Sequence, residues 1–144
     1  MNEDFPDSTS ESIEYGLEAA TGAFHSFRKL SGEHRATFLE KIADILEQNT
    51  EEIISLADRE TSLGLPRLRM ELERTANETI LFAKLARSED WRESRSEEAE
   101  PDRIPIPKPG LQSDNLPLGP VVVIGACNFP LAISVVGTDT MSAL

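Results

Sequence analysis

Cys127 and Asn128 are the two side chains of this sequence whose types and position could do chemistry. They lie in VVVIGACNFPLAIS, residues 121–134, where an apolar run meets a segment with a helical pattern. The Asn128 amide can donate two N–H groups without titrating, so it could stabilise the negative oxygen of a tetrahedral intermediate. The same side chain could instead cap a helix beginning at Pro130. Spacing alone leaves both interpretations open and favours the cap.

Cys127 is the single cysteine of the chain, which excludes an internal disulfide. A thiol beside a helix N-terminus can be a nucleophile. A nucleophilic cysteine also needs a base or a cation close to it. The two histidines, His25 and His34, stand in early helical segments, where we interpret them as structural. We therefore favour a small buried side chain at Cys127 over a nucleophile.

Gly125 follows the apolar run and lacks a side chain, so a ligand or another backbone could approach it closely. No G-x-G-x-x-G and no G-x-x-x-x-G-K-[ST] pattern occurs in the sequence, which predicts no glycine-rich phosphate cradle. No C-x-x-C pair and no H-x-x-x-H spacing occurs either. We therefore predict no metal site.

The composition fits a globular protein, with 39% hydrophobic residues and a formal net charge of −12 in 144 residues. This negative charge repels phosphate backbones and anionic headgroups, so we expect neither nucleic acid nor membrane as a partner. The N-terminal residues form no basic and apolar leader, and no apolar run reaches the roughly 18 residues of a membrane span. We expect the protein in the cytoplasm.

The candidate residues need a strand and a helix to position them. Val121–Ile124 is a β-branched apolar run after Gly119-Pro120, which is typical of a strand buried on both faces. Residues 130–144 predict an apolar helix. A strand of this kind needs neighbouring strands, and the sequence offers none. The C-terminal piece therefore has the pattern of one strand and one helix of a larger α/β sheet.

The preceding residues predict helices. Ser8 and Glu11 form a capping-box pattern for a first helix, and apolar residues then recur at steps of three and four through about residue 90. The predicted faces include Ile13 and Leu17 in the first helix and a stripe of Leu68, Leu72, Thr75, Thr79, Phe82 and Ala86 in the last. Ser31-Gly32 and Leu63-Gly64 interrupt the pattern, and Pro66 suits the first turn of a helix. We divide the chain into an acidic tail (1–9), a helical region (10–90), a charged and proline-rich connection (91–117) and a C-terminal piece (118–144).

The stretch LPLGPVVVIGACNFPLAISVVGTDTMSAL resembles the aldehyde dehydrogenase superfamily, whose members carry P-x-G-x-x-x-x-I-x-x-x-N-F-P here. ETSLGLPRLRMELERTANETILFAKLAR is similar to that family's ETGLPxxRLxGELxRTxxQLxxFA. Among the branches of this superfamily, the sequence most resembles the NADP-dependent 2-oxoglutarate-semialdehyde (2,5-dioxovalerate) dehydrogenases. The resemblance runs from about residue 15 to residue 144.

The resemblance implies an α/β fold: N-terminal helices followed by the first strand and helix of a Rossmann-like nucleotide-binding domain. It matches Asn128 to the family's oxyanion-hole asparagine and reverses the preference for a simple cap. It matches Ile124, Gly125, Ala126 and Cys127 to the segment that lines the nicotinamide-ribose side of the NAD or NADP cleft. Cys127 stands where relatives carry Ser or Trp, so by this match it is not the family nucleophile.

The resemblance also implies a small aldehyde as substrate and a homo-oligomeric enzyme. The family's nucleophilic cysteine and general-base glutamate match no residue of this sequence. We therefore expect an incomplete nucleotide-binding domain in an N-terminal fragment that is inactive alone. The alternative is a small acidic helical module for interaction or oligomerisation, made by the helices of residues 10–87.

Overall fold

The computed structural model of the protein describes residues 6–144. These residues form two units, which are described separately. The first contains the described residues up to Leu30 together with Pro117–Val122, and the second contains Ser31–Leu116 with Val123–Leu144. The predicted acidic tail lies partly outside the described residues, and residues 6–9 are exposed and not helical.

Helix α1, Ser10–Phe27, belongs to the first unit. Its N-cap is Thr9, whose hydroxyl oxygen accepts the Ser12 N–H at 3.1 Å. The predicted helix is confirmed, but the capping box on Ser8 is wrong by one residue. No residue of α1 is buried, and Ile13 and Leu17 of the predicted apolar face are 54% and 51% exposed.

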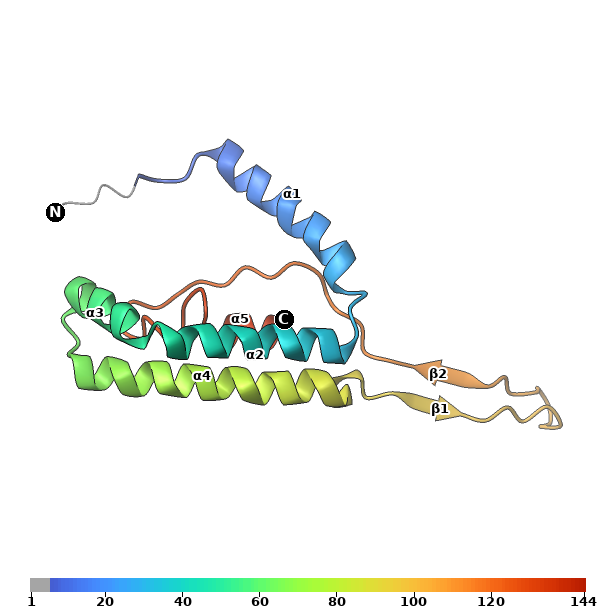
Figure 1. The fold of residues 1–144 in the computed structure, drawn as a ribbon. Helices are drawn as coiled ribbons and strands as arrows, with labels where there is room; N and C mark the ends of the chain where they lie inside the picture. The colour runs from blue at the N-terminus through green and yellow to red at the C-terminus, as the bar shows by residue number, and fades with distance from the viewer. Residues whose placement is uncertain (1–5) are drawn as a thin grey trace. The chain divides into compact units, whose positions relative to one another are not determined.

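Three further helices build the second unit: α2, Gly32–Gln48; α3, Thr50–Thr61; and α4, Leu65–Ser88. Ser31, predicted as the end of the first helix, caps the second by accepting the His34 N–H. Gly64 takes a positive φ of 93° before α4, and Pro66 lies in the first turn as predicted. Helices α2 and α4 run antiparallel and side by side (Figure 1).

The core of this unit lies along the α2–α4 contact and continues under α3. Its buried side chains form two clusters: Ala36, Leu39, Ala83, Ala86 and Met141 in one, and Leu46, Ile54, Ala57, Leu68 and Leu72 in the other. The stripe predicted on α4 is confirmed, since Leu68 and Thr79 are both fully buried. Burial of a leucine of this kind contributes about 1.5–3 kcal/mol.

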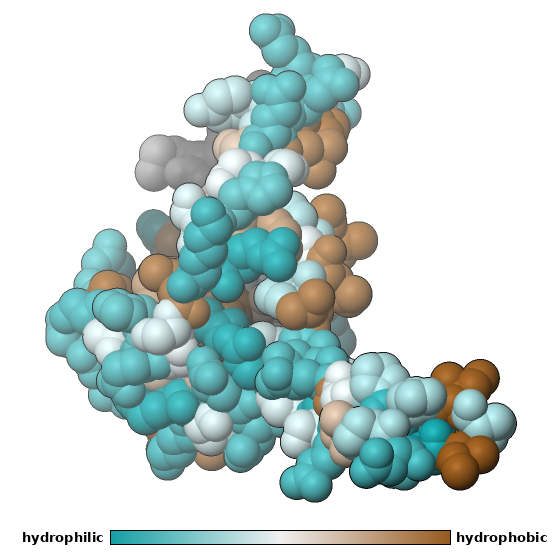
Figure 2. Space-filling model, turned by 90° about the vertical axis from the view of Figure 1, so that its right-hand side faces the viewer, coloured by the Kyte–Doolittle hydropathy of each residue, from teal (hydrophilic) through white to brown (hydrophobic). Residues whose placement is uncertain are grey.

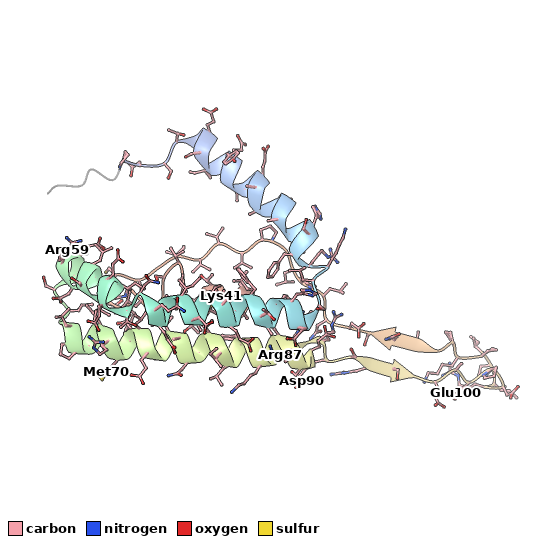
Figure 3. All side chains as sticks on the ribbon, viewed as in Figure 1. Lys41, Arg59, Met70, Arg87, Asp90 and Glu100 are labelled. Atoms are coloured by element: carbon pink, nitrogen blue, oxygen red, sulfur yellow. The ribbon has the colours of Figure 1, made fainter. Side chains whose placement is uncertain are left out.

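Small residues let α2 and α4 come very close at one end. A Cβ added to Gly32 would lie 2.2 Å from the Ala86 carbonyl oxygen, so no larger residue fits there without moving a helix. Arg87 adds ion pairs near the same end, at 2.7 Å to Glu33 and 2.8 Å to Glu40 (Figure 3). Its hydrogen bonds lower the pKa of both carboxyl groups. These pairs are exposed, so hydrophobic burial contributes more to stability.

A hairpin follows α4. After the short 3₁₀ helix η1, Asp90–Arg92, strand β1, Arg95–Glu97, pairs antiparallel with β2, Leu111–Ser113. Four prolines in the connecting segment keep it free of helix, as predicted. The surface is mostly hydrophilic with apolar side chains gathered in a few places (Figure 2), and the exposed ones include Ile104 and Ile106 of this segment.

The predicted strand Val121–Ile124 is wrong, and of the predicted helix 130–144 only Thr138–Ala143 is helical. Residues 120–126 have no regular structure, and Val122 and Ile124 are 76% and 84% exposed. A strand needs a partner for its N–H and C=O groups, and the two strands of the described residues pair with each other. Residues 127–137 form turns and bends before the short helix α5, Thr138–Ala143. No helix within residues 6–144 is long and apolar enough to cross a membrane.

Candidate functional site

The turn that carries Asn128 is held against helix α4 by a buried carboxylate. The Glu71 side chain is 5% exposed, and its Oε1 accepts the backbone N–H groups of Leu131 at 2.9 Å and Ala132 at 3.0 Å. Two successive amides that point at one carboxylate resemble the first turn of a capped helix. Glu71 therefore satisfies two backbone N–H groups that would have no intrahelical partner in a helix beginning at Pro130.

Arg67, one helical turn before Glu71, holds the beginning of the same segment. Its Nη2 donates to the Asn128 carbonyl oxygen at 2.6 Å, and its guanidinium lies 5.1 Å from the centre of the Phe129 ring. The same nitrogen lies 3.5 Å from Glu71 Oε2. The main chain of Asn128 is thereby fixed, whereas its side chain remains available.

Thr75 and Glu78 extend this contact along α4. The Thr75 hydroxyl lies 2.9 Å from the Glu71 carbonyl oxygen and 3.0 Å from that of Leu131. The Glu78 carboxylate accepts a hydrogen bond from the Thr138 hydroxyl and another from Arg74, and these two bonds lower the pKa of Glu78. Residues 67, 71, 75 and 78 are spaced by four, four and three, so they share one face of the helix.

Arg67, Glu71 and Glu78 were not predicted as site residues from the sequence. Thr75 was predicted only as part of the buried stripe of α4. The sequence did contain a pattern that could have indicated Glu71 and Thr75, because MELERT includes the E-L-x-R-T of the quoted family pattern. The partners of these side chains lie about 60 positions further along the chain. No periodicity could have paired them.

Asn128 is exposed, and its side-chain amide makes no hydrogen bond within residues 6–144. The next helix, α5, begins ten residues later with Gly137 as its N-cap. The interpretation of Asn128 as a helix cap is therefore wrong. An exposed amide on a fixed main chain is able to donate to an incoming oxygen.

Residues 124–127 lie directly before this amide. The Ala126 N–H donates to the Ile133 carbonyl oxygen at 2.8 Å, and a Cβ on Gly125 would lie 3.3 Å from that oxygen. The close approach at Gly125 is therefore made by the chain's own turn. Ile124 is exposed, and Cys127 carries a free, exposed thiol, which corrects the prediction of a buried side chain.

The structure brings the predicted residues together as one short exposed strip ending at Asn128. This strip carries no charged side chain and offers a glycine and main-chain groups. In the part of the chain that the structure describes, no group of three or more His, Cys, Asp or Glu side chains could hold a metal ion.

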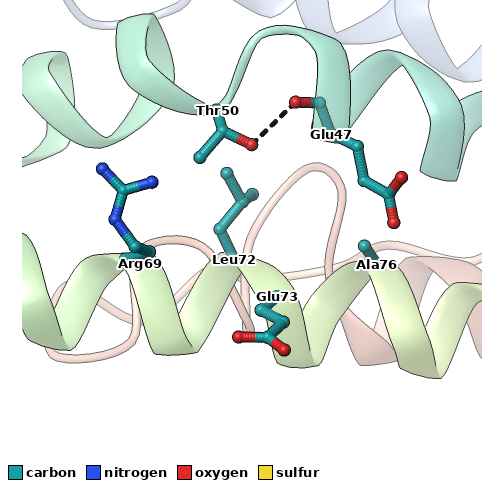
Figure 4. A pocket seen from close by; sticks show the side chains of 6 residues that line it. All are labelled: Glu47, Thr50, Arg69, Leu72, Glu73 and Ala76. Carbon is teal, nitrogen blue, oxygen red and sulfur yellow. Dashed lines mark hydrogen bonds between the residues drawn. The ribbon is translucent and has the colours of Figure 1, made fainter.

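A hollow of about 240 Å³ lies elsewhere, between α4 and the α2–α3 junction (Figure 4). Its lining includes Thr50, Arg69 and Leu72, and Arg69 is already paired with Glu51 at 2.7 Å. The Thr50 hydroxyl donates to the Glu47 carbonyl oxygen at 2.8 Å (Figure 4). Arg69 and Thr50 have partners within the protein, and the other polar side chains of the lining are the exposed carboxylates of Glu47 and Glu73. We therefore assign this hollow no chemistry.

The protein-family model described as "Aldehyde dehydrogenase family" matches residues 2–141 of this sequence. The chain belongs to the aldehyde dehydrogenase family. An "Alpha-ketoglutaric semialdehyde dehydrogenase 2" of Azospirillum brasilense is 42% identical to it over 132 residues, which are 92% of this chain and 25% of that protein. An "Alpha-ketoglutaric semialdehyde dehydrogenase" of Acinetobacter baylyi is 37% identical over 140 residues, 97% of this chain and 27% of that protein.

A third aldehyde dehydrogenase relative, also described as "Alpha-ketoglutaric semialdehyde dehydrogenase", comes from Bacillus subtilis and is 34% identical over 128 residues. Those residues are 89% of this chain and 25% of the relative. The chain thus spans about a quarter of the length of the curated relatives it matches. The resemblance proposed from the NFP stretch is confirmed at the level of the family.

Proposed function

We propose that this chain supplies the oxyanion-binding amide of an aldehyde dehydrogenase that oxidises 2-oxoglutarate semialdehyde to a carboxylate. The observation that carries the proposal is the exposed Asn128 amide on a main chain held by Arg67 and Glu71. Identity of 37–42% to two alpha-ketoglutaric semialdehyde dehydrogenases over almost the whole chain supports the choice of aldehyde.

In the proposed reaction, a thiolate supplied from outside residues 1–144 attacks the aldehyde carbon. As the new C–S bond forms, the carbonyl oxygen becomes an oxyanion, and the Asn128 amide donates to it. NAD or NADP, when bound, would supply the acceptor for the hydride that leaves the same carbon. Hydrolysis of the resulting thioester then releases the carboxylate.

The residues before Asn128 have a positioning role in this proposal. Ile124, Gly125, Ala126 and Cys127 form one wall against the nicotinamide and its ribose, and they exclude water from it. Cys127 contributes surface there and no nucleophile. We further propose that Val121–Ile124 becomes the first strand of a Rossmann-like sheet once neighbouring strands are present, since its exposed valines would then be buried.

The test uses a chimera in which this chain replaces the matched quarter of the Azospirillum enzyme. We expect the chimera to reduce NAD or NADP with 2-oxoglutarate semialdehyde, and the 144-residue chain alone to show no turnover. Asn128→Ala should lower kcat by about 10²–10³-fold, the usual effect of losing one oxyanion donor. Asn77→Ala, at another exposed asparagine, is the matched control.

Two results would contradict this proposal. One is an Asn128→Ala chimera with the kcat of the control. The other is turnover by the isolated chain that Cys127→Ser abolishes, which would make Cys127 a nucleophile.

The second candidate function is the helical interaction module. It is favoured by one observation, namely that α2, α3 and α4 supply every buried residue of the two core clusters except Met141. Size-exclusion chromatography and circular dichroism on residues 1–100 discriminate between the two. A cooperative melt supports the module, whereas a molten or aggregating product supports a segment that needs the rest of an aldehyde dehydrogenase.

A further inference from the structure

A cluster of positive side chains lies at the Ser88 end of α4, away from the Arg67 end that holds Asn128. It consists of Arg35 from α2 with Trp91 and Arg92 from η1, and we refer to these three residues as the Trp91 cluster. Helix α4 has 24 residues and is therefore about 36 Å long. The Trp91 cluster is thus separate from the proposed oxyanion site.

Both guanidinium groups lie against the indole ring. The Arg35 Cζ is 4.9 Å and the Arg92 Cζ 5.1 Å from the Trp91 ring centre. Asn115 fixes the main chain of this turn, because its backbone N–H donates to the Arg92 carbonyl oxygen at 2.8 Å and its Nδ2 donates to that of Trp91 at 3.0 Å. The cluster is therefore built by α2, η1 and the segment after β2.

Three nitrogen donors of the cluster are buried without a hydrogen-bond acceptor: Arg35 Nε, Trp91 Nε1 and Arg92 Nε. Stacking on an aromatic ring covers the flat face of a guanidinium and leaves its in-plane N–H groups in need of acceptors. Arg35 as a whole residue is only 8% exposed. Buried donors without acceptors are rare in native proteins, and they are often explained by a water molecule or an ion.

The two guanidinium groups of the cluster also carry more positive charge than their carboxylate partner balances. Within residues 6–144, Glu89 is the one carboxylate that forms an ion pair with either guanidinium group: its Oε2 lies 3.4 Å from Arg92 Nε, and its Oε1 accepts the Gly32 N–H at 3.3 Å. One positive charge therefore remains without a partner. Burial, followed by the positive charge of the neighbouring Arg92, lowers the pKa of Arg35, and the carboxylate of Glu89 opposes this shift.

We propose that the Trp91 cluster binds a small oxyanion, either a phosphate or a carboxylate group, held by Arg35 and Arg92. Carboxylates and phosphates offer mainly acceptors, which complements N–H groups that lack a hydrogen-bond acceptor, and their oxygens match the fork of a guanidinium. The Arg92 side chain is 35% exposed and provides the approach from solvent. This site does not depend on the proposed aldehyde oxidation.

The test uses Trp91 as its own reporter, because it is the single tryptophan in the chain. The 144-residue protein is titrated with sodium phosphate, with sodium succinate, and with sodium chloride at matched ionic strength. We expect a saturable fluorescence change with phosphate or succinate that chloride does not produce. The two oxyanion arms distinguish a phosphate site from a carboxylate site, and a response in either one supports the proposal.

Arg35→Gln should weaken binding by about tenfold or more, since it removes the fork and the charge. Arg59→Gln, at an exposed arginine of α3 at the far end of the unit (Figure 3), is the matched control and should leave binding unchanged. Circular dichroism checks the fold of both variants. Independently of any variant, NMR of the wild type should show the Trp91 Nε1–H and Arg35 Nε–H signals moving with phosphate or succinate. The proposal fails if both oxyanions act like chloride, or if a folded Arg35→Gln binds as the wild type does.

Discussion

The Glu71 carboxylate determines whether the Asn128 turn stays on α4, and replacing Glu71 tests this directly. In Glu71→Leu, the backbone N–H groups of Leu131 and Ala132 lose the acceptor that now lies 2.9 and 3.0 Å away. A buried donor left without a partner costs about 1–3 kcal/mol, so two of them cost about 2–6 kcal/mol. The turn can move outward and reach water, which limits the loss, and we expect about 3 kcal/mol.

Hydrogen exchange measured by NMR reports this loss at the two amides themselves. A loss of about 3 kcal/mol corresponds to exchange about a hundredfold faster. Glu71→Gln keeps one acceptor oxygen and loses only the charge, so its effect should be about 1 kcal/mol. Glu73→Leu, at an exposed glutamate two positions away on the same helix, is the control. It should change stability by less than about 0.5 kcal/mol.

The reasoning would be refuted by Leu131 and Ala132 amides that exchange in Glu71→Leu as slowly as in the control. Equal losses in the Gln and Leu variants would also contradict it, because that result would assign the whole effect to charge and none to the acceptor.

Three further predictions concern stability in urea. Gly32→Ala should destabilise the protein by about 1–3 kcal/mol despite the better helix propensity of alanine, because the new Cβ would meet the Ala86 carbonyl oxygen at 2.2 Å; an unchanged or higher midpoint would contradict this. Leu68→Ala should cost about 2–5 kcal/mol, since Leu68 is fully buried and its removal leaves a cavity. The hydrogen bond from Thr138 lowers the pKa of Glu78, so the stability that this carboxylate contributes is complete above its ordinary pKa near 4.5 and is lost as the pH falls below that value. Glu78→Gln should therefore lower the urea midpoint more at pH 7 than at pH 3, and equal differences at both pH values would disprove the linkage.

Helix positions in this protein could be predicted from local sequence, because capping residues and apolar periodicity act within a few residues of one another. Ser31 caps the beginning of α2, and Gly64 and Pro66 lie at the beginning of α4, as their chemistry requires. The buried stripe of α4 was predictable for the same reason. The start of α1 differed by one residue because Thr9 caps as well as Ser8 would.

The strand and the C-terminal helix could not be predicted because their conformations depend on distant partners. Val121–Ile124 has the composition of a central strand, but composition supplies no hydrogen-bonding neighbour. Residues 131–136 are rich in β-branched side chains with modest helix propensity. Asn128 was predicted as a site residue from the sequence. The residues that hold its main chain were not predicted, since their contacts join positions about 60 residues apart.

The close approach of Gly32 to Ala86 involves a main-chain atom, and this has a consequence for how the protein can change. A clash between two side chains can be relieved by another rotamer or by trimming the opposite residue. The carbonyl oxygen of Ala86 is common to every amino acid, so no compensating substitution on α4 can make room at position 32. The distance between the two helices is therefore specified by the backbone, and a larger residue at this position requires the whole pair to separate.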